Sequence, residues 1–308
     1  MKGLELSRRF YEEYGKPMLE NFEHLLPYLA VGLAGSGSEC YGYDDEISKD
    51  HDFKPAFCVF VPDSIDECLI FELERAYDKL PKEFLGFGKS VENPVGENRR
   101  GVIRIGDFFE AKVGSRDGNL TVGDWFSIPE FYLLEATNGE IFSDNYGEMT
   151  EIRERLKYFP EDVRLKKLAG HLFTMGQSGQ YNYARCISRN DTAAAQLTAF
   201  EFAKSAMAAA FLIEKRYMPY YKWSFCALRE FSPKLAEKLE FLISTSNDGD
   251  NAKKKCEVIE EVCRNIVEDL VASGLSHFPV PIMQRQAYLI NDGIKDVDVR
   301  NAHILCAI

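Results

Sequence analysis

The sequence predicts an α+β protein, in which a mixed α/β part is followed by a helical bundle. Up to about residue 145, short β-rich runs alternate with helical patterns and glycine-rich turns. From Met149 onward, nearly every segment carries apolar residues at helical spacing. A chain of 308 residues is long enough for two modest domains. We therefore expect an α/β domain over residues 1–147 and a helical bundle domain over 148–308.

The elements are predicted from apolar spacing and from the residues that end each run. Pro62 ends one β-rich run, Gly114 ends one helical pattern, and the pair Asn138 and Gly139 ends another. We expect helices over residues 4–26 (interrupted at Pro17), 64–80, 107–113 and 129–136, strands over 28–33, 53–61, 102–105 and 140–143, and later helices over 152–159, 162–183, 192–216, 233–245, 253–273, 280–290 and 297–305.

The composition excludes several classes of protein. The net charge of −12 repels phosphate backbones, so we do not expect a nucleic-acid partner. The eight cysteines form no CxxC pair, which favours reduced core thiols over a zinc site. The N-terminus lacks the apolar core of a signal peptide, and no stretch approaches the roughly 18 apolar residues of a membrane span. We expect a cytoplasmic protein without a membrane partner.

One segment, residues 34–53, combines a phosphate-binding pattern with a metal-binding pattern. Gly37 and Ser38 follow a predicted buried strand and open a short helix, where backbone N–H groups can hold phosphate oxygens. Asp50 and Asp52 come next, at the start of the following strand. Alternate strand residues share a face, so these two carboxylates lie about 7 Å apart and can bind a divalent cation such as Mg²⁺.

The same segment crowds several further acids into one loop, among them Asp44, Asp45 and Glu46. The alternative interpretation is therefore a turn whose acids are simply solvated. The strand, the Gly-Ser turn and the second strand together favour the site over this alternative.

A Gly-Ser pair followed, after some ten residues, by Asp-x-Asp on a strand resembles the signature of the polymerase-β-like nucleotidyltransferase superfamily. Gly42 fits the usual Gly-Ser-x-x-x-Gly form. The head and helical bundle resemble the aminoglycoside nucleotidyltransferases. The segments GYDDEISKDHDF, GQSGQYNYARCISRND and KRYMPYYKW are most similar to an uncharacterised bacterial family with a nucleotidyltransferase-like head and a helical C-terminal domain.

This resemblance implies a nucleotidyltransferase-like mixed sheet with flanking helices, and an enzyme that transfers a nucleoside monophosphate from an NTP to a hydroxyl-type acceptor. The acceptor is a small molecule or a protein. Gly37 and Ser38 would contact the triphosphate. Asp50 and Asp52 would be catalytic and would hold Mg²⁺, with two ions expected.

One departure from the superfamily pattern supports a second hypothesis. A later strand often supplies a third carboxylate, but the expected strand over residues 102–105 carries none. Arg104 on that strand is instead a candidate phosphate contact. The chain is alternatively a catalytically weakened regulatory protein that binds nucleotide without turning it over.

Three cations in the helical part are further candidates for binding the nucleotide. Arg185 and Arg189 share one face if their helix continues, so they suit a triphosphate, but a structural salt-bridge network with Asp191 explains them equally well. Lys222 lies in the aromatic junction, the segment 215–223 that joins two helices. It is either a phosphate contact or part of a packed aromatic cluster. The tyrosines of that junction are better explained by packing.

Overall fold

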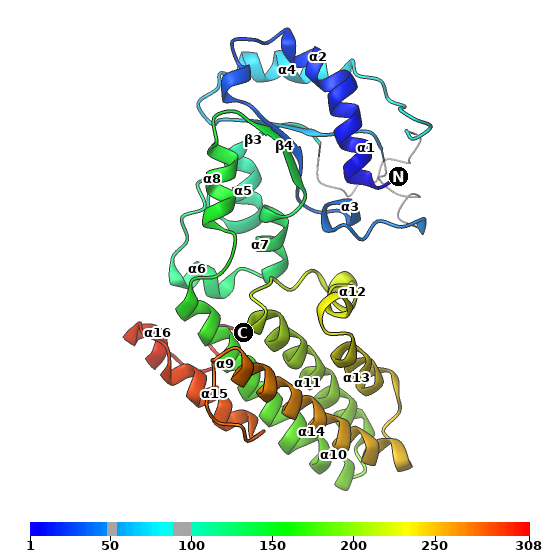
Figure 1. Cartoon of the computed structure of the whole chain (residues 1–308), viewed down its shortest axis with the longest axis vertical. Helices are drawn as coiled ribbons and strands as arrows, with labels where there is room; N and C mark the ends of the chain where they lie inside the picture. Colours follow the sequence, from blue (N-terminus) through cyan, green and yellow to red (C-terminus); the bar gives the residue numbers. More distant parts are fainter. Residues whose placement is uncertain (48–53, 89–99) are drawn as a thin grey trace. The chain divides into compact units, whose positions relative to one another are not determined.

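The computed structural model describes residues 1–47, 54–88 and 100–308. The chain forms two compact units (Figure 1). Unit 1 comprises residues 1–120 and 131–157, and unit 2 comprises residues 121–130 and 158–308. The chain thus passes between the units at three points, whereas the sequence predicted one boundary after residue 147. Unit 1 contains a mixed sheet with flanking helices, and the described elements of unit 2 are helical, so the α+β class is confirmed.

The sheet of unit 1 has the strand order β3-β2-β1-β4. The strands are β1 (Ala30–Leu33), β2 (Cys58–Val61), β3 (Gly101–Arg104) and β4 (Glu140–Asp144). β1 is antiparallel to both β2 and β4, and β2 is parallel to β3. Each predicted strand is present, although β2 begins later than expected.

Helices cover both faces of this sheet, which explains why β1 and β2 are buried along their whole length. On one face, Val59 and Val61 join a hydrophobic cluster with α1 (Gly3–Phe10) and α4 (Glu67–Asp78). On the other face, Phe60 packs edge-on against Phe108 of α5 (Ile105–Val113), with ring centroids 5.2 Å apart. The alternation of side chains along a strand divides these residues between the two faces.

The N-terminal helical region, expected over residues 4–26 with an interruption at Pro17, changes helix type before Pro17 and ends at Glu20. α1 continues into a π-helix, η1 (Tyr11–Gly15), and then into α2 (Lys16–Glu20), with Pro17 in its first turn. The remaining helices of unit 1 are η2 (Leu26–Tyr28), α3 (Ser38–Tyr41), α7 (Glu130–Thr137) and α8 (Glu148–Arg155). Glu130, the first residue of α7, belongs to unit 2, while α8 belongs to unit 1 although the sequence placed it in the bundle.

Unit 2 is built around α9 and α11, which pack against each other and against later helices (Figure 1). Its elements are α6 (Val122–Ser127), α9 (Glu161–Met175), η4 (Gly176–Tyr183), α10 (Ala184–Ser188), α11 (Thr192–Ile213), α12 (Tyr221–Phe231), α13 (Pro233–Ser244), α14 (Gly249–Ala272), α15 (Met283–Asp292) and α16 (Val297–Asn301). Within the described ranges, no helix is both long enough and apolar enough to cross a bilayer.

Candidate functional site

The bend after β1 is made by residues 35–38 and depends on glycine. Gly35 and Gly37 have φ angles of +107° and +126°, which a residue with a Cβ atom rarely adopts. The side chain of Asn138, just after α7, holds the bend. The Gly35 N–H donates to Asn138 Oδ1, and Asn138 Nδ2 donates to the Gly35 carbonyl, both at 3.0 Å. Ser38 then opens α3 and is half-buried. The bend is therefore held in one conformation by a side chain distant in sequence.

The strand register places this bend at the end of the sheet where β2 and β3 begin. Gly32, near the end of β1, pairs with Cys58, the first residue of β2, and Cys58 pairs with Gly101, the first residue of β3. Asp50 and Asp52 come shortly before β2 in the sequence, but they lie outside the described residues. Their pairing on one face therefore stays a prediction. Within the described ranges, no cluster of three His, Cys, Asp or Glu residues is suited to a metal ion.

Arg100 is a cation at this same end of the sheet that the sequence reasoning missed. It immediately precedes β3 and forms an ion pair with Glu39 of α3. Both side chains are largely buried, with exposed fractions of 13% and 12%. The available signal was its position just before the strand expected over residues 102–105. A buried guanidinium beside the bend is a stronger candidate for an anion contact than the surface cations.

A buried ion pair fixes α3 against the rest of unit 1. Lys112 Nζ donates to Glu135 Oε2 at 2.9 Å, and the hydroxyl of Tyr41 in α3 donates to Glu135 Oε1 at 2.9 Å. The side chains of Lys112 and Glu135 are 7% and 8% exposed. Burial, followed by the negative charge of Glu135, raises the pKa of Tyr41, so its hydroxyl remains a donor. In addition, the Gly139 N–H donates to the Cys40 carbonyl at 3.1 Å. These bonds anchor α3 at Cys40 and Tyr41, in addition to the ion pair of Glu39.

Arg153 of α8 contacts the turn after α7, which carries Asn138. Its Nη2 donates to the carbonyls of Thr137 and Asn138 at 2.7 and 2.9 Å, which fixes the turn that carries the Asn138 side chain. Its Nη1 is buried and has no hydrogen-bond partner among the described residues. Burial lowers the pKa of Arg153. The surroundings of α3 therefore contain more than one buried cation.

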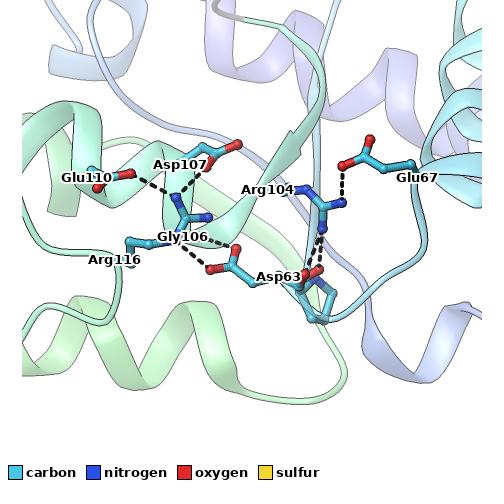
Figure 2. A network of polar contacts seen from close by, with 8 residues as sticks. Asp63, Glu67, Arg104, Gly106, Asp107, Glu110 and Arg116 are labelled. Atoms are coloured by element: carbon cyan, nitrogen blue, oxygen red, sulfur yellow. Dashed lines mark hydrogen bonds and ion pairs between the residues drawn. The ribbon is translucent and has the colours of Figure 1, made fainter.

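The structure does not bring Arg104 together with Gly37 and Ser38. Arg104 is the last residue of β3, and β3 begins at the end of the sheet that carries the bend. Its guanidinium donates to the carbonyl of Asp63 at 2.8 Å and to Glu67 Oε1 at 2.7 Å, as Figure 2 shows. These bonds tie β3 to the turn between β2 and α4. The side chain is engaged at the end of the strand opposite to the bend.

Arg116 gathers three carboxylates beside Arg104 (Figure 2). Its guanidinium contacts Asp63 at 2.9 Å, Asp107 at 2.6 Å and Glu110 at 2.8 Å. Asp63 also accepts the N–H of Gly106 in the first turn of α5 at 3.0 Å. A Cβ atom on Gly106 would lie 2.2 Å from Asp63 Oδ2, so a larger residue there would displace the Asp63 carboxylate from the network. The network joins α5 to the end of β2 and is explained by that structural role.

Arg185 and Arg189 do not form the continuous helical face that the sequence allowed. α10 ends at Ser188, and Arg189 leaves the helix with φ −94° and ψ 2°. The Arg185 guanidinium lies over the ring of Tyr181, 4.8 Å from its centroid. The Asp191 side chain accepts the Ala194 N–H at 3.0 Å and caps α11. The acid invoked for a salt-bridge network thus serves as a helix cap, and the two arginines remain candidates.

Lys222 lies in the first turn of α12, and the tyrosines of the aromatic junction around it differ in burial. Its Nζ is 4.9 Å from the centroid of the Trp223 ring. Tyr217 is buried, with ring centroids 4.9 Å from Phe159, whereas Tyr221 is 76% exposed. The packing explanation holds for Tyr217 but not for Tyr221. Lys222 remains a candidate in unit 2.

The polar run that contains Arg185 is explained by its contacts inside unit 2. Gln180 Nε2 donates to Glu260 and to the Pro281 carbonyl, at 3.0 and 2.8 Å. The Tyr183 hydroxyl donates to Asn247 Oδ1 at 2.9 Å, and the buried ammonium of Lys255 donates to the same oxygen at 2.9 Å. Both polar side chains belong to the π-helix η4. Their bonds fasten η4 to later segments, so Gln180 and Tyr183 are explained without a binding role.

His171 of α9 gives the structure a testable pH dependence. Burial, followed by the positive charges of Lys167 and Lys204, lowers its pKa from 6.5 to about 3. Below pH 6.5 the unfolded chain binds a proton that the folded chain does not bind until about pH 3, so stability falls as the pH falls through this window. The slope contributed by one group is at most about 1.4 kcal/mol per pH unit. Urea unfolding at pH 7.5 and 5.5 checks this. His171→Leu should lose less stability than the wild type over that interval, and equal losses would contradict the assignment.

The family comparison covers the middle of the chain. A model described as a domain of unknown function (DUF4037) matches residues 125–224. The matched segment begins in α6 and ends in α12, so it includes Arg185, Arg189 and Lys222 but not the bend at residues 35–38. A comparison with functionally curated proteins gives no match.

Among solved structures, the chain is similar to the crystal structure of a nucleotidyltransferase-like protein from Exiguobacterium sibiricum 255-15. The two sequences are 10% identical, the TM-score is 0.37, and the alignment covers 92% of this chain and 81% of the other. An assignment of function therefore has to rest on the strands and side chains of this chain itself.

Proposed function

We propose that this protein is a Mg²⁺-dependent nucleotidyltransferase, which moves a nucleoside monophosphate from an NTP to a hydroxyl-type acceptor. The acceptor is a small molecule or a protein. The observation that carries the proposal is the position of the Gly37–Ser38 bend at the end of the sheet where the chain enters β2. Asp50 and Asp52 stand shortly before β2 in the sequence. A phosphate contact and a pair of acids beside one another are what nucleotidyl transfer requires.

The residue types suit these roles. Gly37 has no side chain, so a phosphate can approach its backbone, and the Ser38 hydroxyl is a further donor for the β and γ phosphates. Asp50 and Asp52 supply carboxylate oxygens, the hard ligands that Mg²⁺ prefers, and two bound ions would neutralise charge on the triphosphate. The acids would hold the α phosphate in line with the acceptor hydroxyl.

Arg185, Arg189 and Lys222 are further candidates for a phosphate contact, each with a charged group suited to phosphate. All three belong to unit 2, and the proposed contacts of the bend in unit 1 do not depend on them. Arg104 is left out, because its guanidinium is bound to the turn that follows β2.

A second candidate function is a regulatory protein that binds NTP without transferring it. The observation that favours it is the composition of β3, since Gly101–Arg104 contains no carboxylate to act as a third acid. In this case the bend and the two aspartates bind the nucleotide, and nucleotide binding itself is the output.

The experiment that separates these functions measures pyrophosphate release. The purified protein is incubated with each of the four NTPs and Mg²⁺, with a panel of hydroxyl acceptors, and with EDTA as the matched control. Pyrophosphate that depends on Mg²⁺ supports the transferase. Thermal stabilisation by an NTP without pyrophosphate supports the binding protein, and the absence of both contradicts the two proposals together.

A further inference from the structure

Two arginine–glutamate pairs flank β3, one at each end. Arg100 pairs with Glu39 before the strand, and Arg104 pairs with Glu67 after it. The pairs differ in burial, because Glu39 is 12% exposed whereas Glu67 is 83% exposed. An isolated buried ion pair contributes little net stability, since both charges lose their hydration. Net stability alone therefore does not explain why two charges are buried at the Gly37–Ser38 end.

The Glu39 carboxylate occupies the space beside Gly37 where any other residue would have its side chain. A Cβ atom on Gly37 would be 2.7 Å from each carboxylate oxygen of Glu39. The carboxylate thus covers the backbone at the point where a phosphate would need to approach. Glu39 is an anion, so it also repels a second anion at that point unless it moves or loses its charge.

Arg100 suits the anion that would replace this carboxylate. A guanidinium binds carboxylate and phosphate with the same planar pair of donors. Burial raises the pKa of the Cys40 thiol in α3 and of the Cys58 thiol at the start of β2, and the positive charge of Arg100 opposes both shifts. Arg100 therefore lies close to the bend and to the beginning of the second strand.

We propose that Arg100 is a triphosphate-binding residue and that Glu39 is the internal anion that occupies it until nucleotide binds. This inference rests on the proposed function of the bend. Nucleotide displaces the Glu39 carboxylate from Arg100, so Glu39 lowers the affinity for nucleotide and Arg100 raises it. Two residues that pair with each other in the structure therefore have opposite effects on binding.

Equilibrium binding of the four NTPs with Mg²⁺, and of inorganic tripolyphosphate, tests the opposition directly. Glu39→Gln should tighten binding by about tenfold, because Arg100 is left without an internal partner. Arg100→Gln should weaken binding by about tenfold, because the triphosphate loses its contact with the guanidinium. Glu67→Gln and Arg104→Gln are the matched controls at the other end of β3, and both should stay within about twofold of the wild type.

A purely structural pair gives a different pattern. In that case, Glu39→Gln and Arg100→Gln change binding in the same direction, and this result would overturn the inference while nucleotide binding by the wild type upholds the proposed function. If no NTP binds to the wild type or to Glu39→Gln, the proposed function fails as well. Thermal melting verifies that each variant folds. If Arg100→Gln does not fold, the double variant Glu39→Gln/Arg100→Gln replaces it and should bind about tenfold more weakly than Glu39→Gln, so equally tight binding contradicts the role of Arg100. If Glu39→Gln does not fold, the double variant should bind more tightly than Arg100→Gln, and weaker binding contradicts the role of Glu39.

Discussion

Asp50→Asn and Asp52→Asn are each expected to reduce Mg²⁺-dependent pyrophosphate release by roughly two to four orders of magnitude. Each change keeps the size of the side chain but removes a negative charge, so a proposed ligand of Mg²⁺ becomes a weaker one. The loss should appear in kcat at saturating NTP, because the charge on the reacting phosphate is then less well neutralised. The measurement is the initial rate of pyrophosphate release with the NTP that the wild type prefers.

Asp45→Asn is the matched control for this pair, because Asp45 is an exposed acid of the same loop. If the acids of the loop are merely solvated, all three variants behave alike, and that result would remove the proposed metal site. Thermal melting of all three variants verifies that each is folded, and Asp45→Asn, as an exposed substitution, should change stability by about 0.5 kcal/mol or less.

Lys112→Met is expected to destabilise unit 1 by about 3–5 kcal/mol. Lys112 and Glu135 are both buried, and removal of the lysine leaves the Glu135 carboxylate with an uncompensated charge. Tyr41 still donates to Glu135, but one neutral donor does not replace an ammonium. Because Tyr41 belongs to α3, the same change should loosen the helix that follows the bend. The measurement is the free energy of unfolding in urea.

Two further variants make this stability prediction specific. Lys112→Met/Glu135→Gln should recover much of the loss, since the glutamine is neutral and still offers an oxygen to Tyr41. Lys157→Met removes an exposed ion pair with Glu154, in which both side chains are more than half exposed, and it should cost less than about 1 kcal/mol. Equal losses for Lys112→Met and Lys157→Met would show that the buried pair does not anchor α3.

Local patterns were sufficient to predict most elements of the fold. The run that became β2 is buried on both faces, so it reads as a continuous apolar stretch. Gly114 adopts φ +71° after α5 and ends that helix as expected. The π-helical form of η4 was not predictable, because Gln180 and Tyr183 take that form through bonds to segments more than 60 residues away.

The candidate site was predictable only in part. The bend at Gly37 and Ser38 follows from glycine and a preceding apolar run, both of which are visible in the sequence. The ion pair of Arg100 with Glu39 joins residues 61 positions apart, so it depends on the pairing of β2 with β3. The same pairing directs Arg104 to the other end of the sheet. The register of the strands therefore decides which arginine lies beside the bend, and the pattern of a single sequence does not determine that register.

A crystal structure of the full chain with a non-hydrolysable NTP and Mg²⁺ tests the central claim most directly. We predict triphosphate density against the backbone of Gly37 and the hydroxyl of Ser38, with metal density between that triphosphate and the carboxylates of Asp50 and Asp52. Nucleotide bound elsewhere on the chain, or Asp50 and Asp52 directed away from each other with the bend closed to an anion, would contradict the account.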